Sequence, residues 1–130
     1  MFSLFGTVAI LIGVGSAGAL LVQSIRASMS DDAAAGADLR PAAIALLGSG
    51  IAAMLVLEAA LVFDDFTVSY VADNHSVTTP FPFNIATAWA ALEGSIVLWC
   101  LVLSVFTWLV YRSYEASRDR LGAGALAVMA

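Results

Sequence analysis

Three long apolar runs, separated by short polar stretches, make up most of the chain. They predict helices at about 4–24, 41–63 and 84–112, and a fourth apolar run starts at Leu121. Each of the first three is long enough for the roughly 20 residues that cross the hydrocarbon core of a bilayer as a helix. The fourth run reaches only to Ala130. We therefore expect the start of a helix whose remainder follows in a longer chain or is supplied by a partner.

The composition supports a membrane protein. Of the 130 residues, 62% are hydrophobic and 12% are charged, and the mean hydropathy is +0.96. In a soluble domain about a quarter of the residues are charged. We therefore predict an all-α membrane protein with three transmembrane helices and the start of a fourth. The net charge of -5 argues against nucleic acid as a partner.

The distribution of basic residues predicts the orientation in the membrane. All five are arginines that flank the first loop or follow the third helix: Arg26, Arg40, Arg112, Arg118 and Arg120. The loop at 64–82 has none. Because arginines of short loops stay on the cytoplasmic side, we expect the N-terminus and loop 64–82 to be extracytoplasmic. No basic residue precedes the first apolar core, which favours an uncleaved helix over a signal peptide.

Small residues spaced four apart predict close packing of the first two helices. The pairs are Gly15 with Ala19 and Gly48 with Ala52. In lipid, where dispersion rather than hydrophobicity drives association, this spacing lets helix backbones approach closely. We expect these two faces to contact other helices.

Two carboxylates, Glu58 and Glu93, lie inside the apolar runs. A charge at the bilayer centre costs at least roughly 2.5–3.5 kcal/mol on insertion scales, so such residues face a helix bundle or water. We expect both near the outer membrane boundary, because Glu58 is close to the end of its run and Asn84 is a candidate N-cap before the third helix proper. Two interpretations of Glu93 remain: a carboxylate wetted at the interface, or one that orients a group in another helix.

Helical periodicity places Glu93 on one face of the third helix. Residues three and four apart share a face, and this face also carries Val97, Cys100, Ser104 and Thr107. A neighbouring face carries Trp89, Leu92, Ile96 and Trp99. Tryptophan at the membrane boundary is typical of an aromatic belt. We therefore expect the face with Glu93 to point into the helix bundle.

The stretch "DFTVSYVADNHSVTTPFPFNIATAWAALEGSIVLW", residues 65–99, carries the most specific pattern. It resembles the CcmF/NrfE-type cytochrome c haem lyases. There, a "DF-x-V-x-YVA" stretch is followed by a proline-bearing segment and by a helix entered through "W-x-x-x-EGS-x-x-x-W". The matching positions include Val68, Val71 and Ala72, together with eight that we call the signature residues: Asp65, Phe66, Tyr70, Trp89, Glu93, Gly94, Ser95 and Trp99. The chain departs from the family at Leu92, where a polar residue is usual.

The resemblance implies a role in cytochrome c-type biogenesis. A membrane haem lyase of this family attaches haem covalently to apocytochrome c on the extracytoplasmic side. Residues 1–130 would form its N-terminal scaffold in the cytoplasmic (inner) membrane, and no catalytic residue is assigned. The family's tryptophan-rich haem platform is absent from this sequence, so we expect haem in the complete protein and none on this chain alone. The implied partners are the remaining lyase helices or a split-gene partner, apocytochrome c, haem-delivery proteins and membrane lipid.

His75 is the only histidine and the candidate haem ligand. A neutral imidazole ligates haem iron, but a lone loop histidine is more often solvent exposed, and nothing in the loop supplies a second ligand or a metal site. Cys100 is expected to behave as a small hydrophobic residue. Two other function classes fit the same pattern: a transporter subunit with Glu58 and Glu93 as ion sites, and a cofactor-free membrane assembly subunit.

Overall fold

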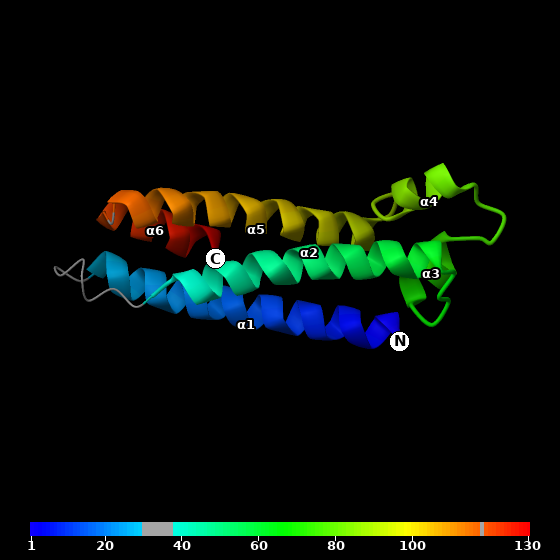
Figure 1. The fold of residues 1–130 in the computed structure, drawn as a ribbon, viewed down its shortest axis with the longest axis horizontal. Helices are drawn as coiled ribbons and strands as arrows, with labels where there is room; N and C mark the ends of the chain where they lie inside the picture. Colours follow the sequence, from blue (N-terminus) through cyan, green and yellow to red (C-terminus); the bar gives the residue numbers. More distant parts are fainter. Residues whose placement is uncertain (30–37, 118) are drawn as a thin grey trace.

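The structure is a computed structural model that describes residues 1–29, 38–117 and 119–130. Within these ranges every regular element is a helix (Figure 1). In chain order the helices are α1 (Phe2–Met29), α2 (Arg40–Val62), α3 (Ser69–Asn74), α4 (Phe81–Thr87), α5 (Leu92–Ser117) and α6 (Arg120–Met129). The all-α prediction is confirmed for this part of the chain.

Three of the described helices, α1, α2 and α5, with 28, 23 and 26 residues, are long and apolar enough to cross a membrane. They correspond to the three predicted transmembrane helices. The predicted start of a fourth is α6, an apolar helix of ten residues. The chain is a membrane protein.

The ends of α1 and α2 show what limits a helix in this chain. α1 continues to Met29 rather than stopping near residue 24, because residues 23–29 contain no glycine or proline that would interrupt its hydrogen bonds. α2 begins at Arg40 with Pro41 in its first turn, where the missing N–H of proline has no helical partner to lose. It ends at Val62, one residue before the predicted end.

The start of the third transmembrane helix was predicted wrongly. The segment from residue 84 does not run directly into α5, which begins at Leu92. Instead, the proline-bearing stretch forms α4, whose N-cap is Pro80, and a turn separates α4 from α5. Asn84 is therefore buried in the middle of a short helix and is not an N-cap.

The four longer helices pack as a ring with one incomplete side. α2 packs against both α1 and α5, and α6 packs against the same two helices. α6 has ten residues and α5 has 26, so α6 covers only part of the length of its neighbours. The chain's last residue consequently lies part-way along the bundle (Figure 1).

Close helix contacts form at glycines other than the predicted ones. A Cβ on Gly13 would lie 2.9 Å from Ser49 Oγ, and one on Gly50 would lie 2.7 Å from a serine hydroxyl oxygen of α5. Beside Gly15 and Gly48, nothing lies within 4 Å of the space that a Cβ would take. Each is two residues from a packed glycine, which is about 200° around a helix of 3.6 residues per turn. Within this chain the predicted faces therefore do not make the close helix contacts, because they lie on the opposite side of each helix. Whether they contact helices outside residues 1–130 stays a prediction.

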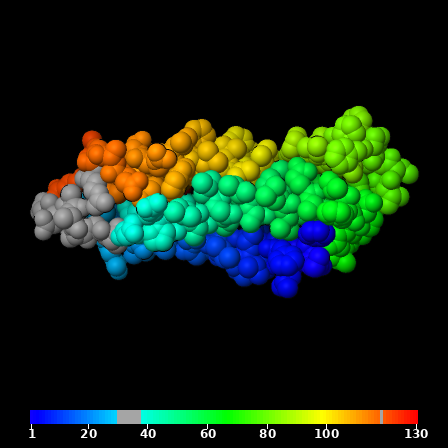
Figure 2. Space-filling view, viewed as in Figure 1, coloured from blue at the N-terminus to red at the C-terminus, as the bar shows by residue number. Residues whose placement is uncertain are grey.

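The two ends of the bundle differ in charge. The start of α1 lies together with α3 and α4 at one end (Figure 1, Figure 2). The described arginines lie toward the opposite end: Arg26, Arg40, Arg112 and Arg120. Arg118 lies outside the described residues. The asymmetry on which the orientation prediction depends is thus present in the fold for the four arginines that the structure describes.

Candidate functional site

Four of the eight signature residues lie in the segment that links α2 to α5, and three more lie in the first turn of α5. Together with the first turn of α5, we call this segment, residues 64–95, the corner. Its chain leaves α2 through Asp64, whose φ of 52° lies in the left-handed region, which aspartate adopts more readily than most residues. Asp65 Oδ1 then accepts hydrogen bonds from Thr67, from the backbone N–H at 3.1 Å and from the hydroxyl at 2.5 Å. The Thr67 hydroxyl bond lowers the pKa of Asp65 below its ordinary value, so the charged carboxylate fixes the turn into α3.

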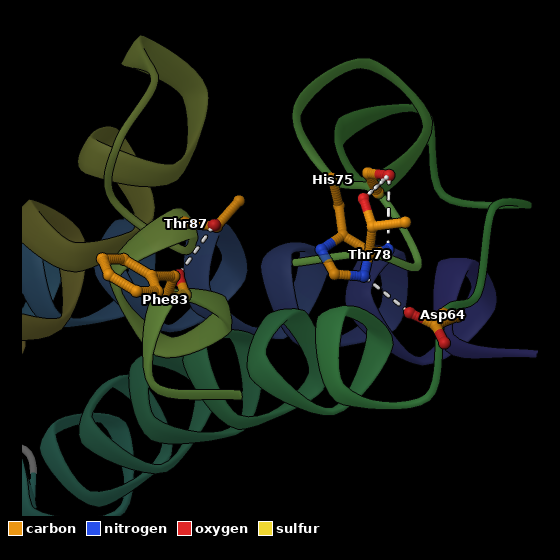
Figure 3. A network of polar contacts seen from close by, with 6 residues as sticks. Asp64, His75, Thr78, Phe83 and Thr87 are labelled. Carbon is orange, nitrogen blue, oxygen red and sulfur yellow. Dashed lines mark hydrogen bonds and ion pairs between the residues drawn. The ribbon is translucent and has the colours of Figure 1, made fainter. Parts of the chain in front are cut away.

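His75 is buried in the corner rather than exposed to solvent. Its side chain is 1% exposed, and Nε2 lies 2.6 Å from Asp64 Oδ1 (Figure 3). Because an ionised carboxylate only accepts hydrogen bonds, Nε2 carries the proton. The ring stacks on Phe66 with centroids 6.1 Å apart, and Nδ1 is buried without a hydrogen-bond partner among the described residues. Nε2 is thus held by Asp64 and Nδ1 is enclosed by the protein. In this arrangement neither ring nitrogen is accessible to haem iron.

Tyr70 connects α3 to the end of α4 and to the turn before α5. The side chain is buried, and its phenol O–H donates to the carbonyl oxygen of Thr87 at 2.7 Å. The same phenol oxygen accepts a longer hydrogen bond, 3.4 Å, from the N–H of Ala91. The Thr87 hydroxyl in turn donates to the carbonyl oxygen of Phe83 at 2.8 Å (Figure 3). One side chain therefore ties three parts of the corner together.

Gly94 lets α5 approach this tyrosine. A Cβ at position 94 would overlap the carbonyl oxygen of Ala88 and would lie 2.5 Å from the Tyr70 phenol oxygen. Real Cβ atoms essentially never come within 3.0 Å of such neighbours. Ala88 is fully buried, and the overlapping atom belongs to the backbone, so it cannot move aside as a flexible side chain would. The geometry requires glycine here.

Ser95 completes the hydrogen bonding of the turn. Its hydroxyl donates to the carbonyl oxygen of Trp89 at 2.8 Å, and its backbone N–H donates to that of Ala91 at 3.0 Å. A buried backbone group without a partner costs about as much as a lost hydrogen bond, and hydrocarbon offers no water as a substitute. Tyr70, Gly94 and Ser95 therefore build a turn whose polar backbone is paired at the entrance to a membrane helix.

Four signature residues lie on the surface of the chain. Phe66, Trp89 and Trp99 are 45%, 42% and 64% exposed, and Glu93 is also exposed. Glu93 lies in the first turn of α5, where the helix dipole stabilises a carboxylate. Its carboxylate has no hydrogen-bond or ion-pair partner among the residues that the structure describes.

The prediction about the faces of α5 was right at Ser104 and Thr107 but not at Glu93 or Cys100, which are exposed. The inward face is buried at Ser104 and Thr107, whereas Leu92 and Trp99 on the neighbouring face are exposed. Glu93 lies on the same side of α5 as Ser104 and Thr107. It is in the first turn of the helix, however, where no described helix covers its side chain. Its expected bundle-facing position is therefore wrong within this chain.

The remaining candidates do not assemble into an ion or metal site. Glu58 is half-buried in the second-last turn of α2, and neither it nor Glu93 is at the middle of a helix. Cys100 is a free, exposed thiol on α5. Within the described ranges, no group of three or more His, Cys, Asp or Glu side chains could hold a metal ion. Carboxylates of transport sites are expected nearer mid-membrane.

Two features of the corner were missed by the sequence reasoning. Asp64 was not recognised as the partner of His75, which lies 11 residues further along the chain. The turn made by Asp65 and Thr67 was also missed, although an aspartate two residues before a threonine is typical of an Asx-type turn. The contacts of Tyr70 and Ser95 with the carbonyl groups of residues 87 and 89 left no signal, because every residue has a carbonyl group. Only the fold determines which of them a side chain reaches.

Curated proteins that resemble the chain are cytochrome c biogenesis proteins, whereas no protein-family model matches it. The chain is 47% identical over 58 residues to the cytochrome c-type biogenesis protein CcmF of Escherichia coli, covering 45% of this chain and 9% of that protein. It is 34% identical over 88 residues to the cytochrome c-type biogenesis protein ccl1 of Rhodobacter capsulatus, covering 68% of this chain and 14% of that protein. The chain thus spans roughly a tenth of the length of these relatives.

A solved structure extends the similarity to nearly the whole chain. A chain described as the cytochrome c heme lyase CcmF matches with a TM-score of 0.86 and 32% sequence identity. The match covers 99% of this chain and 22% of the solved chain. The similarity therefore includes α1, α2 and α6 as well as the corner.

Proposed function

Because this chain is related in sequence and fold to the CcmF/NrfE-type cytochrome c biogenesis proteins, we propose that it forms the N-terminal membrane scaffold of a cytochrome c haem lyase. The observation that carries the proposal is the TM-score of 0.86 at 32% identity over 99% of the chain. It favours cytochrome c biogenesis over a transporter subunit and over a cofactor-free assembly subunit. The complete lyase would receive haem from haem-delivery proteins and attach it covalently to apocytochrome c.

The corner supports this role as a shaped surface at one end of the scaffold. Tyr70 and Gly94 hold α5 in place, and this fixes where the exposed Trp89 and Glu93 lie. We assign the exposed signature residues to contacts with the remaining lyase helices and with lipid. Their side chains are free for such contacts because the buried signature residues complete the turn beneath them.

We propose that the residues of this chain do not form a haem site by themselves, and the position of His75 supports this. His75, the one histidine, has its Nε2 on Asp64 and its Nδ1 enclosed. Iron held by a histidine pair would need ligands from other parts of the complete protein. We therefore assign haem binding to those parts and a scaffolding role to this chain.

The proposed orientation places the corner outside the cytoplasmic membrane and the arginine-bearing end inside. A cysteine in place of Ser76, in a Cys100→Ser background, should react with an impermeant thiol reagent in intact cells. A cysteine in place of Ser117 should react only after the membrane is opened. The reverse labelling pattern would contradict the orientation and leave the fold unaffected.

The proposed function is tested by the absorbance spectrum of the complete membrane protein that contains this chain. We expect haem with a Soret band in the purified complex, and none on residues 1–130 expressed alone. A complete protein without haem, from cells in which loss of the chain leaves cytochrome c unchanged, would support one of the other two classes. A Soret band on the isolated chain would instead restore His75 as a ligand.

A further inference from the structure

Residues 76–92, between α3 and the start of α5, carry no charged side chain and expose several large apolar ones. Phe81 and Phe83 of α4 are 63% and 62% exposed, and Ile85 and Leu92 are also exposed. Single exposed apolar residues are ordinary on a protein surface, whereas neighbouring ones mark contact with a protein, a membrane or a ligand. The question is which of these covers α4.

The sidedness of α4 is the reverse of that of a surface helix in water. Such a helix turns its apolar side chains to the core and its polar ones to solvent. In α4 the amide side chain of Asn84 is buried at 8% exposed, and the phenylalanines point outward. Ala88, four residues after Asn84 and on the same side, is fully buried. This arrangement indicates an apolar environment around the outward side of α4.

The lengths of two transmembrane helices place α4 at a membrane boundary. Leu92 lies about 20 residues before Arg112 of α5, and Ala60 lies about 20 residues after Arg40 of α2. Each stretch rises by about 30 Å, the thickness of the hydrocarbon core. Because arginines near helix ends reach the edge of the core, the opposite edge is at Ala60 and Leu92. α4 packs against α2 and lies beside its corner end (Figure 1).

The size of α4 favours lipid over another helix as the contact of its outward side. Its seven residues give a length of about 10 Å, whereas packed helices interdigitate rows of side chains along their length. The apolar face of an interfacial helix enters the boundary between headgroups and acyl chains by about 5–10 Å. The large apolar side chains of α4 lie at that depth, with no charge among them.

We propose that α4 is an interfacial anchor: its Phe81, Phe83 and Ile85 enter the boundary between headgroups and acyl chains in the leaflet at the corner end. The Tyr70 phenol holds the end of α4 through the Thr87 carbonyl, so the lipid contact fixes the depth of the whole corner. The ligand is the lipid surface, and no particular headgroup is required because residues 76–92 have no charge to recognise one. The inference does not depend on haem chemistry.

Depth-dependent fluorescence quenching in the complete protein tests this anchor. The fluorophore NBD is attached to a cysteine in Phe83→Cys and, separately, in Phe81→Cys, with Cys100→Ser and every other cysteine of the complete protein replaced. The matched control is Ser76→Cys, at an exposed polar position of the corner. Each protein is placed in phosphatidylcholine nanodiscs. The quenchers are a lipid nitroxide near the headgroup end of the acyl chain, a lipid nitroxide near the middle of the chain, and aqueous iodide.

We expect both α4 labels to lose more fluorescence to the shallow nitroxide than to the deep one, and less to iodide than the label at Ser76 loses. Quenching by iodide as strong as at Ser76 would place α4 in water and overturn the proposal. Protection from all three quenchers would mean that protein covers α4, and stronger quenching by the deep nitroxide would place α4 inside the hydrocarbon core. Either result would also overturn it. The proposed lyase function could stand in each case, because no readout contains haem.

Discussion

The phenol oxygen of Tyr70 occupies the space that a side chain at Gly94 would need, only 2.5 Å from where its Cβ would be. The tyrosine is on α3, and the glycine is in the first turn of α5. The contact sets how α5 enters the bundle. These two signature residues are thus one structural unit.

Replacing Gly94 should destabilise the protein. In Gly94→Ala the new methyl group meets a buried carbonyl oxygen, and overpacking of this kind costs about 1–3 kcal/mol. The matched control is Gly15→Ala, where nothing lies within 4 Å and a gain of roughly 0.5–1 kcal/mol is expected from the better helix propensity of alanine. Thermal midpoints of the detergent-purified proteins should therefore move in opposite directions. Equal midpoints would show that the corner is not packed as described.

Tyr70→Phe should weaken the corner without creating a cavity. The substitution removes the hydroxyl that pairs with the carbonyl of Thr87 and the N–H of Ala91, and leaving buried groups unpaired costs about 1–3 kcal/mol. Tyr114 is equally buried at 9% exposed, and its hydroxyl has no hydrogen-bond partner within the described ranges. Tyr114→Phe should therefore lower the unfolding midpoint less, and a larger drop for Tyr114→Phe would refute this assignment.

Replacing His75 should lower the stability of the protein and leave haem binding by the complete lyase unchanged. His75→Ala removes the partner of Asp64 and the ring that stacks on Phe66. We expect a loss of about 1–3 kcal/mol, as for other broken buried networks, with an unchanged ratio of haem to protein in the complete lyase. Phe66→Ala, which removes the other ring of the stack, serves as the comparison. Loss of haem in His75→Ala alone would mean that the imidazole leaves Asp64 to bind iron.

Glu93 should affect cytochrome c production more than the stability of the chain. Because its side chain is exposed here, substitutions should change stability by no more than about 0.5 kcal/mol. If it pairs with another lyase helix, the yield of holocytochrome c should fall in the order wild type, Glu93→Gln, Glu93→Leu, Glu93→Lys. Haem staining normalised to the membrane level of each variant measures this order, and equal yields would leave Glu93 as a wetted interfacial charge.

The sequence was sufficient for the features that depend on length and hydropathy. The three transmembrane helices and the start of α6 follow from the lengths of the apolar runs, because a helix needs roughly 20 residues to cross the bilayer. The signature also pointed to the proteins that the comparisons then matched, because the residues from Trp89 to Trp99 form a specific pattern when taken together.

The features that the sequence did not predict depend on contacts between segments that are distant in the chain. Periodicity gave the right face of α5 at Ser104, but it could not show that no described helix covers Glu93. The spacing of small residues suggested Gly15, whereas the contact with α2 is made through Gly13. The ion-pair contact of His75 joins it to Asp64 in the left-handed turn 11 residues earlier, which the sequence pattern did not indicate.

The most direct test of the central claim is the amount of covalent haem in cytochrome c from cells that lack this chain. Haem staining is compared after complementation with the wild-type chain, with Gly94→Leu and with Gly15→Leu at equal membrane levels. We predict no holocytochrome c without the chain, full recovery with the wild type and with Gly15→Leu, and little with Gly94→Leu. Normal holocytochrome c in cells without the chain would contradict its assignment to a haem lyase.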